Sequence, residues 1–409
     1  MAQHVASAGS TDRSTSAPGP APLCASLHVS QLELWSDGHS VVLAGTWRST
    51  PCAVRRLVLQ GPSACTAAQN RAVRDAVLSS ALTHPHLLAT YHLEARPLAV
   101  LSQPPAPVSS GAPCLAEPQR PQVAGASATA AAVSLPSLSA SPASLAGAAA
   151  LELLIAQELC NLGSCAQLLA QRALGDGVAS ADPHMRRLLL GVMWQVAAAL
   201  EHLHSRGVMH GGVSPAALHL KLLPHGETLG SSAGYGPGSP LPPALHDSRL
   251  VAKLSSFDCS FLLPEGSGSV AMPSAAVGSA ACAAGGGAFD AAVHCAPEVL
   301  ERGRGSTASD MHSFGSVCVA LCFGRSLREA CALYGAPAGS SPAGTSGTGP
   351  ALGPRCVGPL AGSGAVLRLP EACPEMLASV LSWCLSPDPA IRPPARSVMH
   401  ALEQLLHST

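Results

Sequence analysis

The sequence predicts an α+β protein, with strands in its first 160 residues and helices in most of the remainder. Three observations predict this class. Short apolar segments separated by turn residues fill most of the stretch from residue 32 to residue 93. Beyond residue 160 the pattern is typical of helices, and stretches rich in Pro, Ala, Ser and Gly interrupt it. Strands grouped before helices are typical of α+β architectures.

Five strands and one helix are expected before residue 160. Turn residues at Asp37-Gly38 and Ser49-Thr50-Pro51 separate the first three strands, because Asp, Gly, Ser and Pro favour turns. Residues 66–82 have helical spacing, with Val73 and Val77 on one side. The expected strands cover residues 32–35, 41–47, 52–59, 87–93 and 151–159.

Low-complexity stretches divide the chain. Residues 1–27 are rich in Ser, Pro, Ala and Gly and offer little to bury, so a disordered tail is expected. Residues 102–147 have a similar composition with almost no charge, and we interpret them as an insertion that need not form a packed core. Three further stretches are too long for the loops of a compact core, so flexible insertions are expected there. They cover residues 226–247, 264–290 and 335–364.

The composition argues against several classes of protein. A formal net charge of −1 gives no electrostatic reason to bind nucleic acid. No apolar run of 18 residues lacks Pro, Gly and Ser, and no signal peptide is visible. We therefore expect no membrane span and a soluble intracellular protein, cytoplasmic or nuclear. The 15 cysteines form no CxxC pair and the 17 histidines no HExxH motif, so reduced thiols and no metal site are expected.

The most informative segment reads HGGVSPAA at positions 210–217 and follows a helical pattern over 195–209. It resembles the H-R-D-L-K-P-x-N catalytic loop of eukaryotic protein kinases, with substitutions at the chemical positions. The resemblance puts Gly212 where the base aspartate would be, Ser214 at the lysine and Ala217 at the metal-binding asparagine. Gly212 has no proton acceptor, and loss of a positioned base typically forfeits roughly 10²–10⁴ in rate.

Seven further segments match the same family in the same order. Together they resemble the tyrosine-kinase-like group of serine/threonine kinases. The resemblance implies a two-lobed fold: a small lobe over 28–160 with a five-stranded sheet and one helix, and a larger, mostly helical lobe over 161–409. The segments are GTWRSTPCAVRRL at 45–57, LTHPHLL at 82–88, LIAQELCNLGS at 154–164, AKLSSFDCS at 252–260, APE at 296–298, SDMHSFG at 309–315 and DPAIRP at 388–393.

The resemblance also implies substitutions in the small lobe. Arg55 stands at the third-strand lysine, and Asp75 at the glutamate of the small lobe's helix. Lysine occurs in this chain only at Lys221 and Lys253, so no small-lobe lysine can replace it. Arginine presents a bulky fork rather than a point charge. An Arg55–Asp75 pair would then be a structural latch rather than an ATP clamp.

The implied phosphate and metal positions are equally altered. Ser256 and Ala217 stand at the two metal ligands, although magnesium prefers hard anionic oxygen. Asp258 is an alternative ligand, if the chain register shifts by two residues. The three loop glycines correspond to Trp35, Asp37 and Ser40, and Gly38 leaves a one-residue alternative in the register.

The implied nucleotide pocket is mixed. Val42 and Ala53 match its apolar roof, whereas His219 stands where a floor leucine is expected. Gln157 corresponds to the gatekeeper, and the hinge runs from Glu158 to Cys160. ATP bound without magnesium is thus one hypothesis, and otherwise no cofactor is expected.

The positions with structural roles in the family are retained. Glu298 and Arg392 resemble a buried ion pair, and Asp310 resembles the residue that binds the catalytic-loop backbone. His210 and Phe257 correspond to two members of the regulatory spine. Gly211 replaces the arginine that would receive a phosphate from the activation segment, which spans residues 259–295.

Two functions follow from the resemblance. The first is a catalytically inactive pseudokinase that acts as a signalling scaffold or allosteric binding module, with a protein partner such as an active kinase or a signalling complex. The alternative is an active or weakly active ATP-dependent serine/threonine kinase.

Overall fold

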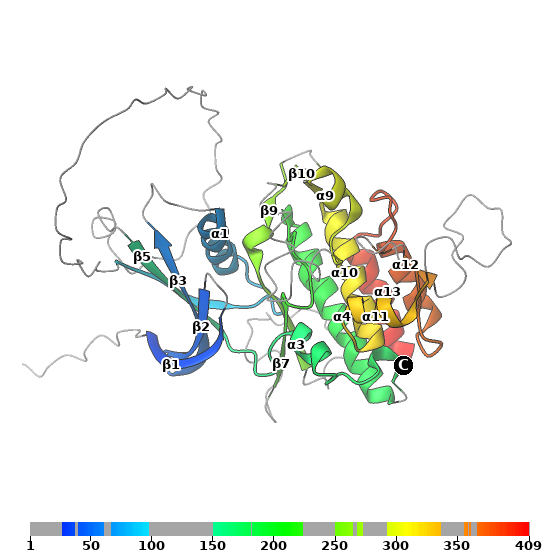
Figure 1. The fold of residues 1–409 in the computed structure, drawn as a ribbon, viewed down its shortest axis with the longest axis horizontal. Coiled ribbons are helices and arrows are strands. Elements are labelled where there is room, and N and C mark those ends of the chain that lie inside the picture. Colours follow the sequence, from blue (N-terminus) through cyan, green and yellow to red (C-terminus); the bar gives the residue numbers. More distant parts are fainter. Residues whose placement is uncertain are drawn as a thin grey trace, which may run out of the picture.

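The computed structural model of the chain describes residues 27–36, 40–60, 67–97, 150–180, 182–223, 250–264, 268–272, 293–336, 356–358, 360 and 366–408. Within them it has a five-stranded antiparallel sheet and eight α-helices, so the predicted α+β class is confirmed. The sheet and helix α1 lie on one side of the molecule, and the other helices lie on the opposite side (Figure 1).

The sheet has the order β1-β2-β3-β5-β4, and every neighbouring pair is antiparallel. Helix α1 (Ala67–Ala81) packs on one face through Ala72 and Ala76, whose small side chains let it approach Leu57 and Ile155 closely. The strands are β1 (Leu27–Ser36), β2 (Ser40–Trp47), β3 (Thr50–Gln60), β4 (Thr90–Pro97) and β5 (Ala150–Glu158).

Two strands differ in extent from the prediction. Strand β1 begins at Leu27, where it pairs with Trp47, and not at residue 32. Strand β4 covers Thr90–Pro97 rather than 87–93. The reason is that the residues before β4 form backbone hydrogen bonds with Leu254 of β8. Leu88 N–H donates to the Leu254 carbonyl at 2.8 Å, and Leu254 N–H donates to the His86 carbonyl at 2.8 Å.

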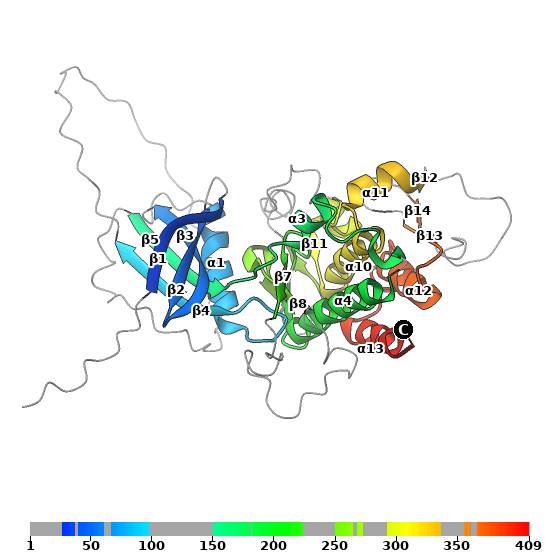
Figure 2. The same cartoon turned by 90° about the horizontal axis from the view of Figure 1, so that it is seen from below.

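Helices α4 (Pro183–His204) and α10 (Thr307–Phe323) form the centre of the helical half. Asp182 caps α4 by accepting a hydrogen bond from His184 N–H at 2.9 Å, and proline follows at the first helical position. Figure 2 shows α4 beside α13. The remaining helices are α3 (Cys165–Ala170), α9 (Pro297–Arg302), α11 (Leu327–Tyr334), α12 (Glu375–Cys384) and α13 (Ala395–Ser408), with 3₁₀ turns η2 (Gly177–Ala179) and η3 (Phe257–Cys259).

Short antiparallel strand pairs complete this half. Their pairings are β6 with β9, β7 with β8, β10 with β11, and β14 with both β12 and β13. The strands are β6 (Val208–Met209), β7 (Leu218–Leu222), β8 (Leu250–Leu254), β9 (Phe261–Leu262), β10 (Val270–Ala271), β11 (Arg304–Gly305), β12 (Gly335–Ala336), β13 (Cys356–Val357) and β14 (Val366–Arg368).

Two of the expected insertions contain short strands that pair with the rest of the helical half. Strand β10 lies within 264–290, where it pairs with β11. Strands β12 and β13 lie within 335–364 and pair with β14, and Leu360 is fully buried. Apolar residues in these stretches therefore join the core. The tail is expected over 1–27, but residue 27 begins strand β1. Residues 1–26 and the insertions at 102–147 and 226–247 lie outside the described residues.

Two segments beside the sheet contact the β7–β8 hairpin of the helical half. The first precedes β4 and pairs with Leu254. The second follows β5: Leu162 N–H donates to the Leu220 carbonyl at 3.2 Å, and Leu220 N–H donates to that of Gly163 at 2.9 Å. In the part of the chain that the structure describes, no helix is long and apolar enough to span a bilayer.

Candidate functional site

The substituted positions converge where the sheet meets the helical half. Arg55, on β3, forms an ion pair with Asp75, on α1, so the expected contact is present. Asp75 is 3% exposed, and its second oxygen accepts a hydrogen bond from Phe257 N–H at 2.7 Å. Arg55 Nε also donates to Ser40 Oγ at 3.4 Å. The Asp75 carboxylate thus fixes β3, α1 and η3 together.

Next to this contact, Ser256 has an unusual backbone conformation, and Phe257 buries its side chain. Ser256 has φ 68° and ψ 69°, a left-handed conformation that costs a non-glycine residue roughly 1 kcal/mol or more. Phe257 is buried, and its ring packs on that of His210 with centroids 5.3 Å apart. His210 and Phe257, which the resemblance assigns to the regulatory spine, are therefore in contact.

His210 is a buried, neutral structural residue. Its Nε2 lies 3.0 Å from the Ser255 carbonyl oxygen, which can only accept, so Nε2 carries the proton. Its Nδ1 accepts a hydrogen bond from Gly212 N–H at 3.2 Å. Burial lowers the pKa of His210, which keeps the ring neutral. Both nitrogens are occupied by backbone groups, and neither is free for a substrate.

Asp310 holds the backbone that follows β6. One carboxylate oxygen accepts from His210 N–H and the other from Gly211 N–H, each at 2.8 Å. His204 Nε2 lies 2.9 Å from the same carboxylate, which is 1% exposed. This backbone role is the one that the sequence predicts for Asp310.

Gly211 is required by its surroundings. Its φ is +72°, and a Cβ there would lie 2.3 Å from the Cys259 carbonyl oxygen. A side chain at this position would force the backbone of η3 to move. The substitution at the expected phosphate-binding arginine is thus built into the local packing, which the sequence alone did not reveal.

The positions expected to carry the chemistry offer small or neutral groups. Ala217 is buried, and its carbonyl accepts from Ser255 Oγ at 3.0 Å. Ser214 Oγ lies 3.4 Å from Ala217 N–H, and Gly212 contributes only its backbone. Among the described residues, no three His, Cys, Asp or Glu side chains are grouped so that they could hold a metal ion.

Asp258 is a further carboxylate near Asp75 and Arg55. Burial and the charge of Asp75 raise its pKa to about 6, and Arg55 and Arg71 oppose the shift. At neutral pH this carboxyl is mainly ionised and could ligate magnesium, so its position in the turn is what separates it from the expected ligand. Phe257 packs on His210, which matches the register that assigns Ser256, and not Asp258, to the expected ligand position.

The expected pocket positions lie along β2, β3 and β5. Val42 and Ala53 are half-buried, and Gln157 Nε2 donates to Thr90 Oγ1 at 3.5 Å. Burial, with a further contribution from Glu158, raises the pKa of Cys160 to about 12, so this thiol is unreactive.

Two pocket residues, His219 and Glu158, have surroundings that sequence reasoning did not predict. Burial lowers the pKa of His219 to about 4, so its ring is neutral. Glu158 is ion-paired with Lys221 at 3.1 Å and Lys253 at 2.7 Å. Its carboxylate is thereby directed toward β7 and β8.

The ion pair between Glu298 and Arg392 is present and extensively bonded. Arg392 Nη1 and Nη2 lie 2.6 and 2.8 Å from the two Glu298 oxygens. The guanidinium also donates to three backbone carbonyls, and its side chain is 0% exposed. These carbonyls belong to Ser386, Pro387 and Ala308.

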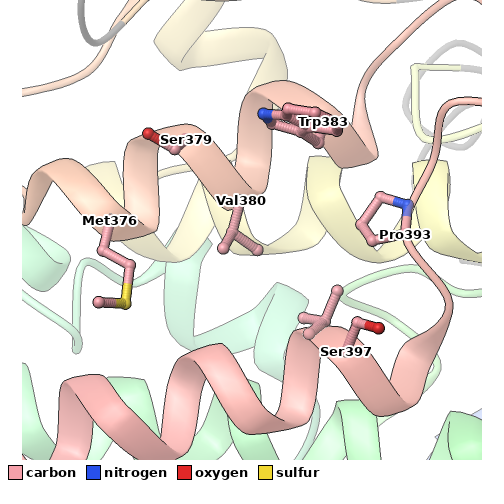
Figure 3. A pocket seen from close by; sticks show the side chains of 7 residues that line it. Met376, Ser379, Val380, Trp383, Pro393 and Ser397 are labelled. Carbon is pink, nitrogen blue, oxygen red and sulfur yellow. The ribbon is translucent and has the colours of Figure 1, made fainter.

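A shallow pocket lies away from this site, between α12 and α13 (Figure 3). Its volume is about 270 Å³ and its lining is mostly apolar. Met376 and Trp383 are partly exposed at its edge. The other lining residues are Ser379, Val380, Pro393, Ser397 and Val398. It contains none of the residues expected from the sequence.

Comparison with known proteins adds no family assignment. The sequence matches no family model, and no curated protein matches it significantly.

Proposed function

We propose that this chain is a protein-kinase-like domain without phosphotransferase activity, which acts as a binding module or scaffold in signalling. One observation carries the proposal: Asp75 joins Arg55 to the Phe257 backbone, while Gly212 and Ala217 present no acidic or amide side chain. The charged side chains of Arg55 and Asp75 thus make contacts that stabilise the fold.

The chemical argument is that phosphoryl transfer depends on positioned charge. The protein must hold the metal ions and phosphates and orient the nucleophile, with little covalent work of its own. Gly212 lacks a base, and Ser256 is a neutral hydroxyl in a left-handed turn. Asp258, the remaining candidate, stands two residues beyond the expected ligand position, and burial raises its pKa to about 6. These deficits overlap, so their effects do not multiply.

The contacts outside the cleft support a binding role. Asp310 fixes the loop backbone, and Arg392 joins α9 to the segment before α13. Both networks are almost completely buried. They hold surfaces in place independently of nucleotide, which suits a scaffold for a protein partner, such as an active kinase or a signalling complex.

The test is a phosphotransfer assay with the purified full-length chain, ATP labelled at the γ-phosphate, and magnesium or manganese. We expect no transfer to the chain itself or to a generic serine/threonine substrate above that of a heat-denatured sample. Transfer that disappears in Asp258→Ala and persists in Asp176→Ala, an exposed control, would favour the active-kinase alternative instead.

A second candidate is a nucleotide bound without metal as a structural ligand. It is favoured by Arg55, which keeps a positive charge and whose side chain is 23% exposed. In that case ATP would raise the melting temperature in the presence of a chelator, because a ligand of the folded state stabilises it. Arg55→Met would remove the rise, and Arg48→Met, at an exposed position, would not.

A further inference from the structure

The two lysines of the chain bind the same carboxylate. Lys221 Nζ lies 3.1 Å from Glu158 Oε1, and Lys253 Nζ lies 2.7 Å from Glu158 Oε2. The 21 remaining basic residues of the Lys/Arg class are arginines. We call Glu158, Lys221 and Lys253 the lysine clamp.

The lysine clamp joins the two halves of the molecule. Glu158 is the last residue of β5, and its N–H donates to the Ala89 carbonyl at 2.8 Å. Lys221 lies on β7 and Lys253 on β8, in the registers Lys221↔Val251 and His219↔Lys253. Because opposed residues and residues two apart share a face, both lysines project from the same face of the hairpin. The clamp therefore ties the five-stranded sheet to β7–β8.

The two arms of the clamp differ in exposure. The Lys253 side chain is 4% exposed and the Lys221 side chain 20%. A buried ammonium is tolerated only when it is paired, so Lys253 depends on Glu158. Lys221 can reach solvent. It is the more accessible of the two side-chain amines of the protein.

We propose that Lys221 is an acylation site of the folded protein, and that its modification releases one arm of the lysine clamp. The donor class is an activated acyl group, such as a thioester or an acyl phosphate. The neutral Nζ attacks the acyl carbon and a C–N bond forms. The bond from the carbonyl carbon to the leaving group breaks, and the leaving group departs with its electron pair. Solvent takes both protons that the ammonium nitrogen loses, one before the attack and one after it. This inference does not depend on the proposed function.

Acylation removes one positive charge and leaves the rest of the clamp paired. The intact clamp holds two ammonium groups and one carboxylate; after acylation, Glu158 and Lys253 remain as a neutral pair. The fold persists, but the connection after β5 loses one link to β7. Hydrogen exchange at Leu162 and Leu220, whose amides donate across this connection, becomes faster.

The experiment treats the full-length chain with N-hydroxysuccinimidyl acetate and follows each amine by peptide mass spectrometry. We expect Lys221 to be acetylated about tenfold or more faster than Lys253, since Lys253 reacts only through local opening. The N-terminal amine serves as an internal reference, and both lysines should react in denaturant. Equal rates for the two lysines, or no reaction at Lys221, would refute the assignment.

Hydrogen exchange then tests whether acetylation of Lys221 weakens the contact between β7 and the connection after β5. Acetylated wild type and Lys221→Gln should both exchange faster at Leu162 and Leu220, with a melting temperature lower by about 1–4 °C. Lys221→Arg keeps the charge, should exchange like wild type, and blocks acetylation. If Lys221→Gln fails to fold, acetylated wild type gives the same readout. Unchanged exchange after complete acetylation would show that the clamp does not couple the two halves.

Discussion

Two arginine–carboxylate pairs among the described residues differ in how completely they are enclosed. Arg392 binds both oxygens of Glu298 and three backbone carbonyls, with no exposed side-chain surface. Arg55 reaches Asp75 through a single nitrogen, and 23% of its side chain is exposed. In the helical half, all three guanidinium nitrogens of Arg392 therefore donate hydrogen bonds. The site between the sheet and the helical half has a less complete network, in which Asp75 ties α1 to β3 and η3.

The largest effect should come from Arg392. Arg392→Met leaves Glu298 and three carbonyls without a buried donor, so we expect a loss of about 3–5 kcal/mol in the free energy of unfolding. Urea denaturation followed by circular dichroism measures it. Arg396→Met, at an exposed position on α13, should change stability by less than about 0.5 kcal/mol. A loss below about 1 kcal/mol for Arg392→Met would contradict the comparison.

Asp310 gives the next largest effect. Asp310→Asn keeps one acceptor oxygen but cannot bind both His210 N–H and Gly211 N–H, so we expect a loss of about 1.5–3 kcal/mol. The same denaturation experiment measures it. Asp388→Asn is the matched control, because Asp388 lies exposed at a turn. If both variants behave alike, the loop backbone does not depend on Asp310.

A smaller effect is expected at the Arg55–Asp75 pair. Asp75→Asn can still accept from Phe257 N–H, but it loses the charge that pairs with Arg55. Because Arg55 can be hydrated, we expect a loss of about 1–2 kcal/mol. Asp176→Asn, which is exposed, should be neutral. A loss as large as that of Arg392→Met would mean that the two pairs are equivalent.

The effect at Asp258 depends on pH and vanishes at low pH. Its pKa is about 6 in the folded protein against 3.8 ordinarily, so the folded state holds the proton more tightly. Stability is therefore lost as pH rises from about 4 to about 6. Asp258→Asn should gain up to about 3 kcal/mol over wild type above that range and nothing below it. Unfolding titrations at several pH values check this, and a constant difference would contradict it.

Sequence patterns predicted the parts of the structure that depend on local signals or on ordered motifs. The α+β class, the Arg55–Asp75 contact and the Glu298–Arg392 pair belong to this group. The lysine clamp was not predicted, because Lys221 is 63 residues from Glu158 and only the pairing of β7 with β8 brings Lys253 beside it. The start of β4 was misplaced because backbone pairing with Leu254 overrides the local pattern.

The most direct test of the central claim is a thermal-shift titration of the full-length chain with ATP, with and without magnesium. The side chains at the expected metal positions are neutral, so we predict that magnesium adds nothing to any shift caused by ATP. A magnesium-dependent rise would contradict the claim, and at a hundredfold excess over the dissociation constant it would correspond to about 2.7 kcal/mol.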